Sequence, residues 1–144
     1  MSRVEDALSQ FQKGYSCAQA ILSTYGVEFD IDPKTALKVS GAFGAGMARM
    51  AETCGAVTGA FMVIGLMHAS ADVVDEDAKE KTYGAVREFA DKFTAQNGSI
   101  VCKELLGCDI GTDEGMKTAA DNELFDIKCT KFVREAAELL EEML

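Results

Sequence analysis

Apolar residues recur along most of the chain at the three- and four-residue spacing of amphipathic helices, with short polar or glycine-containing stretches between them. Residues 3–13 are expected to form one short helix that stops near Gly14, and residues 16–26 a second. Asp32 followed by Pro33 is typical of a helix start, with the aspartate as N-cap and the proline at the first helical position. We find no convincing strand pattern in any segment.

The middle of the chain contains its most apolar segment and its longest amphipathic one. Residues 41–52, "GAFGAGMARMAE", are rich in glycine and are expected to be irregular and closely packed. Thr53 is expected to begin a central apolar helix that ends near Ala69. Residues 72–98 predict a long amphipathic helix that is capped by the Asn-Gly pair at its end. Its expected apolar face consists of Val74, Ala78, Lys81, Tyr83, Val86, Phe89, Ala90 and Phe93.

The last third of the chain predicts one short helix and one longer one. The short helix is expected from residue 99 to residue 106, where Gly107 stops it, and residues 112–125 are ambiguous. Residues 130–143 predict a terminal helix with one apolar side, made of Phe132, Val133, Ala136, Leu139, Leu140 and Met143. The pattern as a whole predicts an all-α protein, a single domain over residues 1–144 with about six or seven helices.

The net charge of the chain and the length of its longest apolar stretch argue against several kinds of partner. The chain has 144 residues and a formal net charge of −10, without a basic stripe, so we expect no binding to nucleic acid or to anionic membranes. The longest apolar stretch, residues 54–67, is shorter than the roughly 20 residues of a membrane span. The beginning of the sequence, "MSRVEDALSQFQKGYS", lacks the features of a signal peptide, so we expect a cytoplasmic protein. Its acidic, helix-rich surface is compatible with a homodimer.

Cysteines are the main candidates for chemistry, and the chain has five, at positions 17, 54, 102, 108 and 129. Their odd number and the missing secretion signal argue against a disulfide scaffold. Reduced thiols remain, and these can hold a metal or a cluster, carry out redox chemistry, or simply fill space in the core. The spacing contains no CxxC pair, so any joint site must be assembled by folding.

Four of the cysteines fall at expected helix starts. Cys17 and Cys54 each follow a hydroxyl residue suited to the N-cap, Cys102 falls in a first turn, and Cys129 lies beside the start of the terminal helix. The candidate caps are Ser16, Thr53, Ser99 and Thr130. Free amide groups and the helix dipole favour anions at such positions, so we expect these thiols to have a lowered pKa. Cys108 follows a helix end instead, and we leave it out of the candidate site.

Other residues offer weaker signals. Gly55 and Gly59 predict close approach of another backbone, or a space beside the preceding cysteine for a cluster or a second sulfur. "GAFGAG" lacks the strand and the Lys-Ser/Thr that a phosphate-binding loop requires. The single histidine, His68, excludes a histidine-rich metal site, and we expect Met47 and Met50 to pack in the core rather than to line a soft-metal site. There is no nucleophile–base–acid set, and no enzyme class is assigned.

Four segments containing these cysteines resemble, in order, the family called C-GCAxxG-C-C, a family of small helical redox-active proteins. The segments are "SCAQAIL", "FGAGMARMAETCGAVTGAFMVIGL", "GSIVCKELLGCD" and "KCTKFVREAAELL", and residues 54–59 match the central motif. The resemblance covers essentially the whole chain and implies a site formed by Cys17, Cys54, Cys102 and Cys129, with Cys108 as an extra cysteine. A related domain in split-Soret cytochromes uses cysteines to hold an iron–sulfur cluster. This chain has no CxxCH motif, so haem chemistry is not implied.

Our leading hypothesis is therefore a redox protein in which Cys17, Cys54, Cys102 and Cys129 bind an iron–sulfur cluster for electron transfer, with zinc as the alternative metal. Its redox partner protein is not identified by the sequence. A second hypothesis is a metal-free thiol–disulfide protein in which Cys17 or Cys54 is the attacking thiol. A third is a helical interaction module in which the cysteines only pack.

Overall fold

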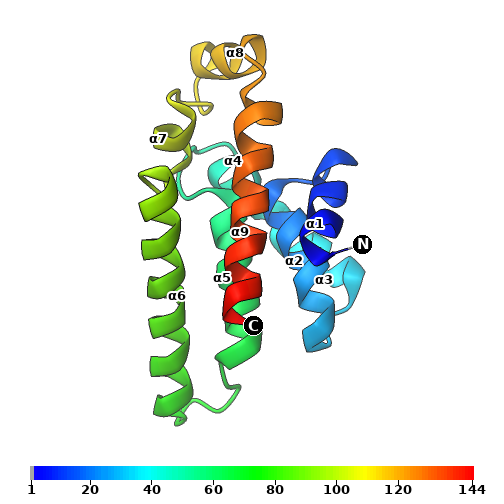
Figure 1. Cartoon of the computed structure of the whole chain (residues 1–144), viewed down its shortest axis with the longest axis vertical. Helices are drawn as coiled ribbons and strands as arrows, with labels where there is room; N and C mark the ends of the chain where they lie inside the picture. Colours follow the sequence, from blue (N-terminus) through cyan, green and yellow to red (C-terminus); the bar gives the residue numbers. More distant parts are fainter. Residues whose placement is uncertain (1) are drawn as a thin grey trace.

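Helices make up most of the chain in the computed structural model, which describes residues 2–144 (Figure 1). The α-helices are α1 (Arg3–Gln12), α2 (Cys17–Tyr25), α3 (Pro33–Ser40), α4 (Gly44–Met47), α5 (Gly55–His68), α6 (Glu76–Asn97), α7 (Cys102–Leu106), α8 (Asp113–Asp121) and α9 (Thr130–Met143). Two 3-10 helices, η1 (Gly26–Phe29) and η2 (Gly41–Phe43), and a π-helix, η3 (Phe125–Cys129), lie between them. Residues 2–144 form no strand, and one isolated bridge joins Thr53 to Val101. The predicted all-α class is confirmed.

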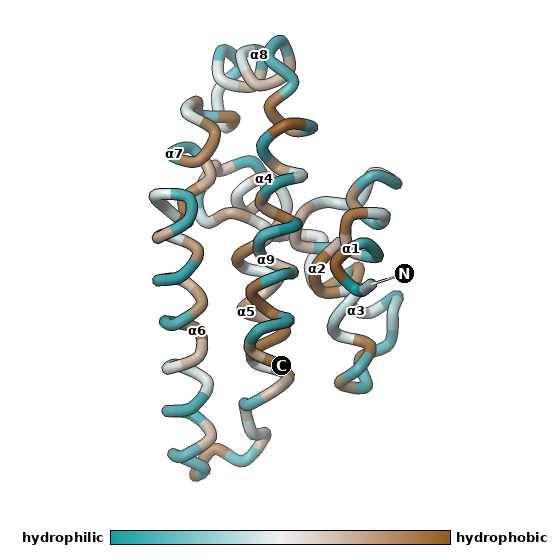
Figure 2. Tube along the Cα trace, in the orientation of Figure 1, coloured by the Kyte–Doolittle hydropathy of each residue, from teal (hydrophilic) through white to brown (hydrophobic). Residues whose placement is uncertain are grey.

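Helix α5 lies at the centre and contacts α2, α6 and α9. In Figure 1, α6 and α9 stand beside α5, α1 to α3 form a group on the other side, and α7 and α8 lie at one end. Aromatic rings connect the long helices, because the Phe89 ring lies 6.1 Å from those of Phe61 and Phe93, and Phe93 lies 6.0 Å from Phe132. Figure 2 shows hydrophobic residues along α5 and alternating hydrophobic and hydrophilic turns along α6 and α9. No helix within residues 2–144 is both long and apolar enough to cross a membrane.

Local capping residues begin and end the helices largely where the sequence predicts. Ser16 caps α2 through a capping box with Gln19, and Asp32 caps α3 ahead of its proline. Gly98 ends α6 in a left-handed conformation that glycine adopts at low cost. The terminal helix has the predicted bounds, and five of the six residues of its predicted apolar side are buried, whereas Met143 is partly buried.

Three sequence predictions need correction. Helix α6 begins at Glu76, not residue 72, and its expected apolar face is wrong at Tyr83 and Val74, which are 58% and 76% exposed. Only Phe89 and Phe93 of that helix are buried. Helix α5 begins one residue later than expected, so its N-cap is Cys54 rather than Thr53. The ambiguous region before residue 125 contains α8.

A close backbone approach in the core joins α2 to α5. A Cβ atom on Gly59 would lie 2.9 Å from the carbonyl oxygen of Ala18, and one on Gly55 would lie 3.1 Å from the Ala18 nitrogen. Side chains at either position would separate the two helices, so the predicted close approach at these glycines is confirmed. Its effect is to bring the start of α2, where Cys17 lies, beside the start of α5.

Residues 45–51, which we call the strap, follow an unusual left-handed path. The strap includes Ala45, Gly46 and Met47 of α4, so this short element is not a right-handed helix. Six of these seven residues have φ between 57° and 68°, namely Ala45, Gly46, Met47, Ala48, Arg49 and Ala51. Left-handed helical backbone costs about 1–2 kcal/mol for each non-glycine residue, so the five here amount to about 5–10 kcal/mol. That is as large as the net stability of a typical domain, about 5–15 kcal/mol, so the rest of the structure must hold the strap in place. The prediction of an irregular, closely packed segment is confirmed.

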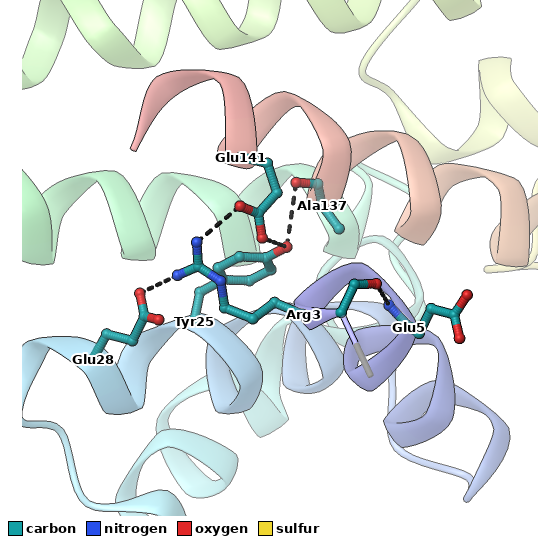
Figure 3. Close-up of polar contacts among 7 residues, drawn as sticks. Arg3, Glu5, Tyr25, Glu28, Ala137 and Glu141 are labelled. Carbon is teal, nitrogen blue, oxygen red and sulfur yellow. Dashed lines mark hydrogen bonds and ion pairs between the residues drawn. The ribbon is translucent and has the colours of Figure 1, made fainter.

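A polar cluster fastens the first helix to the last one (Figure 3). The Arg3 guanidinium donates to Glu28 and, at 2.8 Å, to Glu141, and it lies over the ring of Tyr25. The buried Tyr25 hydroxyl is 3.0 Å from Glu141 and 3.3 Å from the carbonyl oxygen of Ala137. Burial and the neighbouring Glu141 carboxylate raise the pKa of Tyr25 well above its usual value.

Candidate functional site

A cavity of about 330 Å³ lies where the starts of α2, α5 and α7 meet the end of η3, and four cysteines line it. They are the four that the sequence places together, Cys17, Cys54, Cys102 and Cys129. Apolar side chains form most of the remaining wall, namely Phe11, Tyr15, Leu105, Leu106, Ile110, Phe125 and Phe132. The cavity opens to solvent beside Gly14 and Tyr15 and reaches the buried thiols at its inner end. The cavity is therefore the main candidate site.

Cys17 and Cys54 reach the cavity through the contact between α2 and α5. Cys17 is the first residue of α2, behind the Ser16 cap, and Cys54 is the N-cap of α5. The backbone N–H groups of Ala56 and Val57 face the Cys54 sulfur closely enough to lower its pKa, and the Val57 N–H also donates to the carbonyl oxygen of Cys54 at 3.0 Å. The amides at the start of α5 are thus directed at a sulfur atom, as expected for a helix N-terminus next to an electron-rich group.

Cys102 is held beside Cys54 by a short antiparallel pairing of residues 52–54 with residues 100–102. The Cys54 N–H donates to the carbonyl oxygen of Ile100 at 2.8 Å, and the Cys102 N–H donates to the backbone carbonyl oxygen of Glu52. This pairing surrounds the Thr53–Val101 bridge. Cys102 lies in the first turn of α7, as predicted, but the helix begins at Cys102 rather than at residue 99, and its N-cap is Val101 and not Ser99. Ser99 instead accepts from the N–H of Val101.

Cys129 arrives from the other end of the chain on a π-helix. It is the last residue of η3, which continues into α9 without a break, so the expected cap at Thr130 is absent and Cys129 does not lie at a free helix start. A π-turn carries one residue more than an α-turn and therefore turns the following side chains to a different face. The neighbouring Lys128 donates to the carbonyl oxygens of Leu105 and Leu106, both at 3.4 Å, and so connects η3 to the end of α7.

Burial reverses the expected effect of the helix starts on three thiols. Desolvation raises the pKa of Cys54 to about 12 and that of Cys102 to about 12, with the backbone amides that face Cys54 acting in the opposite direction. These side chains are only 6% and 8% exposed. The pKa of Cys17 is also raised, first by its hydrogen bond to Cys129 and then by burial, so the predicted lowering is wrong for Cys17, Cys54 and Cys102. For Cys54 and Cys102, the reason is that loss of water outweighs the helix dipole once a thiol enters the core.

Cys17 and Cys129 are in direct contact. The Cys17 thiol donates a hydrogen bond to the Cys129 sulfur, which raises the pKa of Cys17 and lowers that of Cys129. Among the four cavity cysteines, Cys129 is thus the one with the expected lowered pKa, although the cause is a neighbouring thiol rather than a helix start. Both residues are partly exposed, whereas Cys54 and Cys102 are buried.

The remaining candidates lie outside the cavity. Cys108, left out of the site on sequence grounds, does not line it. Met47 and Met50 do not line it either, and Met50 is 60% exposed, so its predicted place in the core is wrong. His68 is partly buried at the end of α5. Sequence reasoning missed the apolar wall, since the spacing of Phe11 and Phe125 in their own segments indicates burial but not a shared cavity.

Four thiols are the donor type that both iron–sulfur clusters and structural zinc sites use. Among residues 2–144, no three His, Cys, Asp or Glu side chains converge closely enough to hold one metal ion. Zinc bound by four cysteines needs all four sulfurs about 2.3 Å from a single point. An iron–sulfur cluster instead binds its cysteines through different iron atoms.

Comparison with known proteins identifies the family. No curated protein and no solved structure matches the chain. The family model described as putative redox-active protein (C_GCAxxG_C_C) matches residues 15–143, a range that contains all four cavity cysteines. The chain belongs to the C_GCAxxG_C_C family of redox-active proteins.

Proposed function

We propose that the protein transfers electrons by means of an iron–sulfur cluster held in the four-thiol cavity. The observation that carries this proposal is that Cys17, Cys54, Cys102 and Cys129, which come from four separate elements, line one cavity while Cys108 does not. Cysteine thiolates are the ordinary ligands of [2Fe–2S] and [4Fe–4S] clusters. When bound, the cluster supplies the one-electron redox chemistry.

The chain's own groups support this role in three ways. The thiols of Cys17, Cys54, Cys102 and Cys129 would bind iron as thiolates, each releasing its proton. The N–H groups of Ala56 and Val57 would then donate to a ligand sulfur and so favour the reduced, more negative state. The apolar wall limits the access of water, which is a second factor that sets the potential of a bound cluster.

The test is anaerobic reconstitution of the reduced protein with ferrous iron and sulfide, followed by iron and sulfide analysis and a visible spectrum. Each of Cys54→Ser and Cys102→Ser should lower the bound iron and the charge-transfer absorption severalfold. Cys108→Ser is the matched control and should bind as much iron as the unmodified protein. A colourless protein without iron, or a Cys108→Ser variant that loses the cluster, would contradict the proposal.

A second candidate function, thiol–disulfide exchange, rests on the hydrogen bond between Cys17 and Cys129. Oxidation of this pair to a disulfide releases two protons and two electrons, which a disulfide in a partner protein accepts to become two thiols. Mild oxidation of the metal-free protein and peptide mapping test this candidate. A Cys17–Cys129 bridge that forms before any other supports it, and a different first bridge argues against it.

A further inference from the structure

The strap, residues 45–51, lies directly against the thiol cavity. Ala45 and Gly46 form part of the cavity wall. Gly46 is buried, and a Cβ atom placed on it would lie 2.7 Å from the Cβ of Cys102 and 2.7 Å from the Cα of Ala51. No side chain fits between this part of the strap and Cys102.

Contacts at its two ends connect the strap to the elements that carry three of the thiols. Gly44, just before the strap, is so close to Ser16 that a Cβ atom would lie 2.7 Å from the serine Cβ, and Ser16 caps the helix of Cys17. At the other end, the carbonyl oxygen of Ala51 accepts from the N–H of Lys103 at 3.2 Å. The chain then continues into the paired segment that contains Cys54. The strap thus spans the starts of α2, α5 and α7.

The strap has a strained backbone, and its middle residues are exposed to solvent. Gly46 and Ala51 are buried against the site, whereas Ala48, Arg49 and Met50 are exposed. Its left-handed backbone contains five non-glycine residues, for which this conformation is unfavourable. The strain energy of the strap therefore falls whenever the strap leaves this path. Away from the cavity, the exposed part of the strap is held by a hydrogen bond from the N–H of Met50 to the carbonyl oxygen of Met47 and by the close approach of Gly111 to the Arg49 carbonyl oxygen. These contacts are local, and segments held by local contacts open before the core does.

We propose that the strap is a gate on the thiol cavity, which opens to expose Cys54 and Cys102 when no group is bound and closes over them when one is. The cavity opens to solvent beside Tyr15, whereas Cys54 and Cys102 are only 6% and 8% exposed, so access to these two thiols is narrow while the strap is in place. Movement of the strap widens this access because Gly46 packs on Cys102 and the strap leads directly into the segment of Cys54. The identity of the bound group, an iron–sulfur cluster, rests on the proposed function.

The gate can be tested first in reduced, metal-free protein by limited trypsin digestion, because Arg49 lies in the exposed part of the strap. Cleavage after Arg49 should be faster than cleavage after Arg87, which lies within α6. Ala48→Gly removes strain from the closed strap and should slow cleavage after Arg49 by roughly three- to tenfold. Ala95→Gly, at an exposed position of right-handed helix, is the matched control and should leave this cleavage unchanged.

Thiol alkylation supplies a second reading of the same motion. In the metal-free protein, Ala48→Gly should slow alkylation of Cys102 by the same factor as it slows the cleavage, while alkylation of Cys108, outside the cavity, should not change. The gate is wrong if Arg49 is cleaved no faster than Arg87. It is also wrong if Ala48→Gly and Ala95→Gly have equal effects on cleavage and alkylation.

Addition of ferrous iron and sulfide then separates the gate from the proposed function. If a cluster binds, cleavage after Arg49 should fall at least about tenfold. A bound cluster without this protection overturns the gate and leaves the proposed function intact. If no cluster binds but the metal-free results hold, the gate stands and the proposed function fails.

Discussion

Gly59→Ala is the substitution for which the structure makes the sharpest prediction. Gly59 lies inside α5, and an added Cβ would lie 2.9 Å from the carbonyl oxygen and 3.2 Å from the Cα of Ala18. Both are backbone atoms of α2, which cannot rotate away as a side chain can. The helix itself must move, and Cys17 moves with it because it directly precedes Ala18.

The expected magnitude follows from two opposing effects. Insertion of a methyl group into a well-packed core costs about 1–3 kcal/mol. Replacement of glycine by alanine inside a helix stabilises the helix by about 0.8–1.0 kcal/mol. The free energy of unfolding should therefore fall by up to about 2 kcal/mol, which corresponds to a decrease in Tm of up to about 8 °C for a chain of this size.

Gly65→Ala is the matched control, because Gly65 lies in the same helix and has no atom within 4 Å of the place where its Cβ would be. The same substitution should there raise the free energy of unfolding by up to about 1 kcal/mol. Urea unfolding followed by circular dichroism measures both changes. If Gly59→Ala stabilises the protein as much as Gly65→Ala does, the close approach of α2 and α5 does not constrain the fold and our account of the glycines is incorrect.

Three further predictions concern other parts of the molecule. Tyr25 has a raised pKa, so the folded protein keeps the phenol proton to a higher pH than the unfolded chain does. The free energy of unfolding should therefore decline as the pH rises above about 10. Tyr25→Phe should make this decline shallower in unfolding experiments at pH 9 to 12. Ser16→Ala removes the cap of α2 and should cost about 1 kcal/mol in urea unfolding, together with faster alkylation of Cys17, whereas unchanged alkylation would show that the cap does not hold this thiol. Gly115→Ala would place a Cβ against the carbonyl oxygen of Asp109 and should lower Tm by more than Gly59→Ala does; an equal or smaller loss would mean that the loop before α8 adapts.

Local signals account for most of what the sequence predicts correctly. Interactions within a few residues determine several helix boundaries. The examples are the proline that follows Asp32, the serine before Cys17 and the glycine after Asn97. The periodic apolar side of residues 130–143 predicts the buried face of α9 in the same way. The amphipathic pattern fails at Tyr83, because the neighbours that would cover it are set by the tertiary arrangement.

The geometry of the candidate site depends more on tertiary structure. Helix starts suggest that Cys17, Cys54, Cys102 and Cys129 belong together, and all four line the cavity. The pKa values do not follow from the same reasoning, because burial and the contact between two thiols are decided by distant parts of the chain. The strap, residues 45–51, is not predictable locally either, since Ala, Met and Arg have no preference for left-handed backbone.

The origin of the cavity in four separate elements has a consequence for how the protein is synthesised. Cys17 and Cys129 are about 110 residues apart, so at about 5–20 residues per second the first thiol waits roughly 5–20 seconds before its partner is made. During that interval Cys17 and Cys54 belong to an incomplete chain and have neither a cavity nor a neighbouring thiol from the C-terminal half. No fragment that ends before Cys129 contains all four thiols, which makes the loading of a cofactor a late event in the synthesis of the chain.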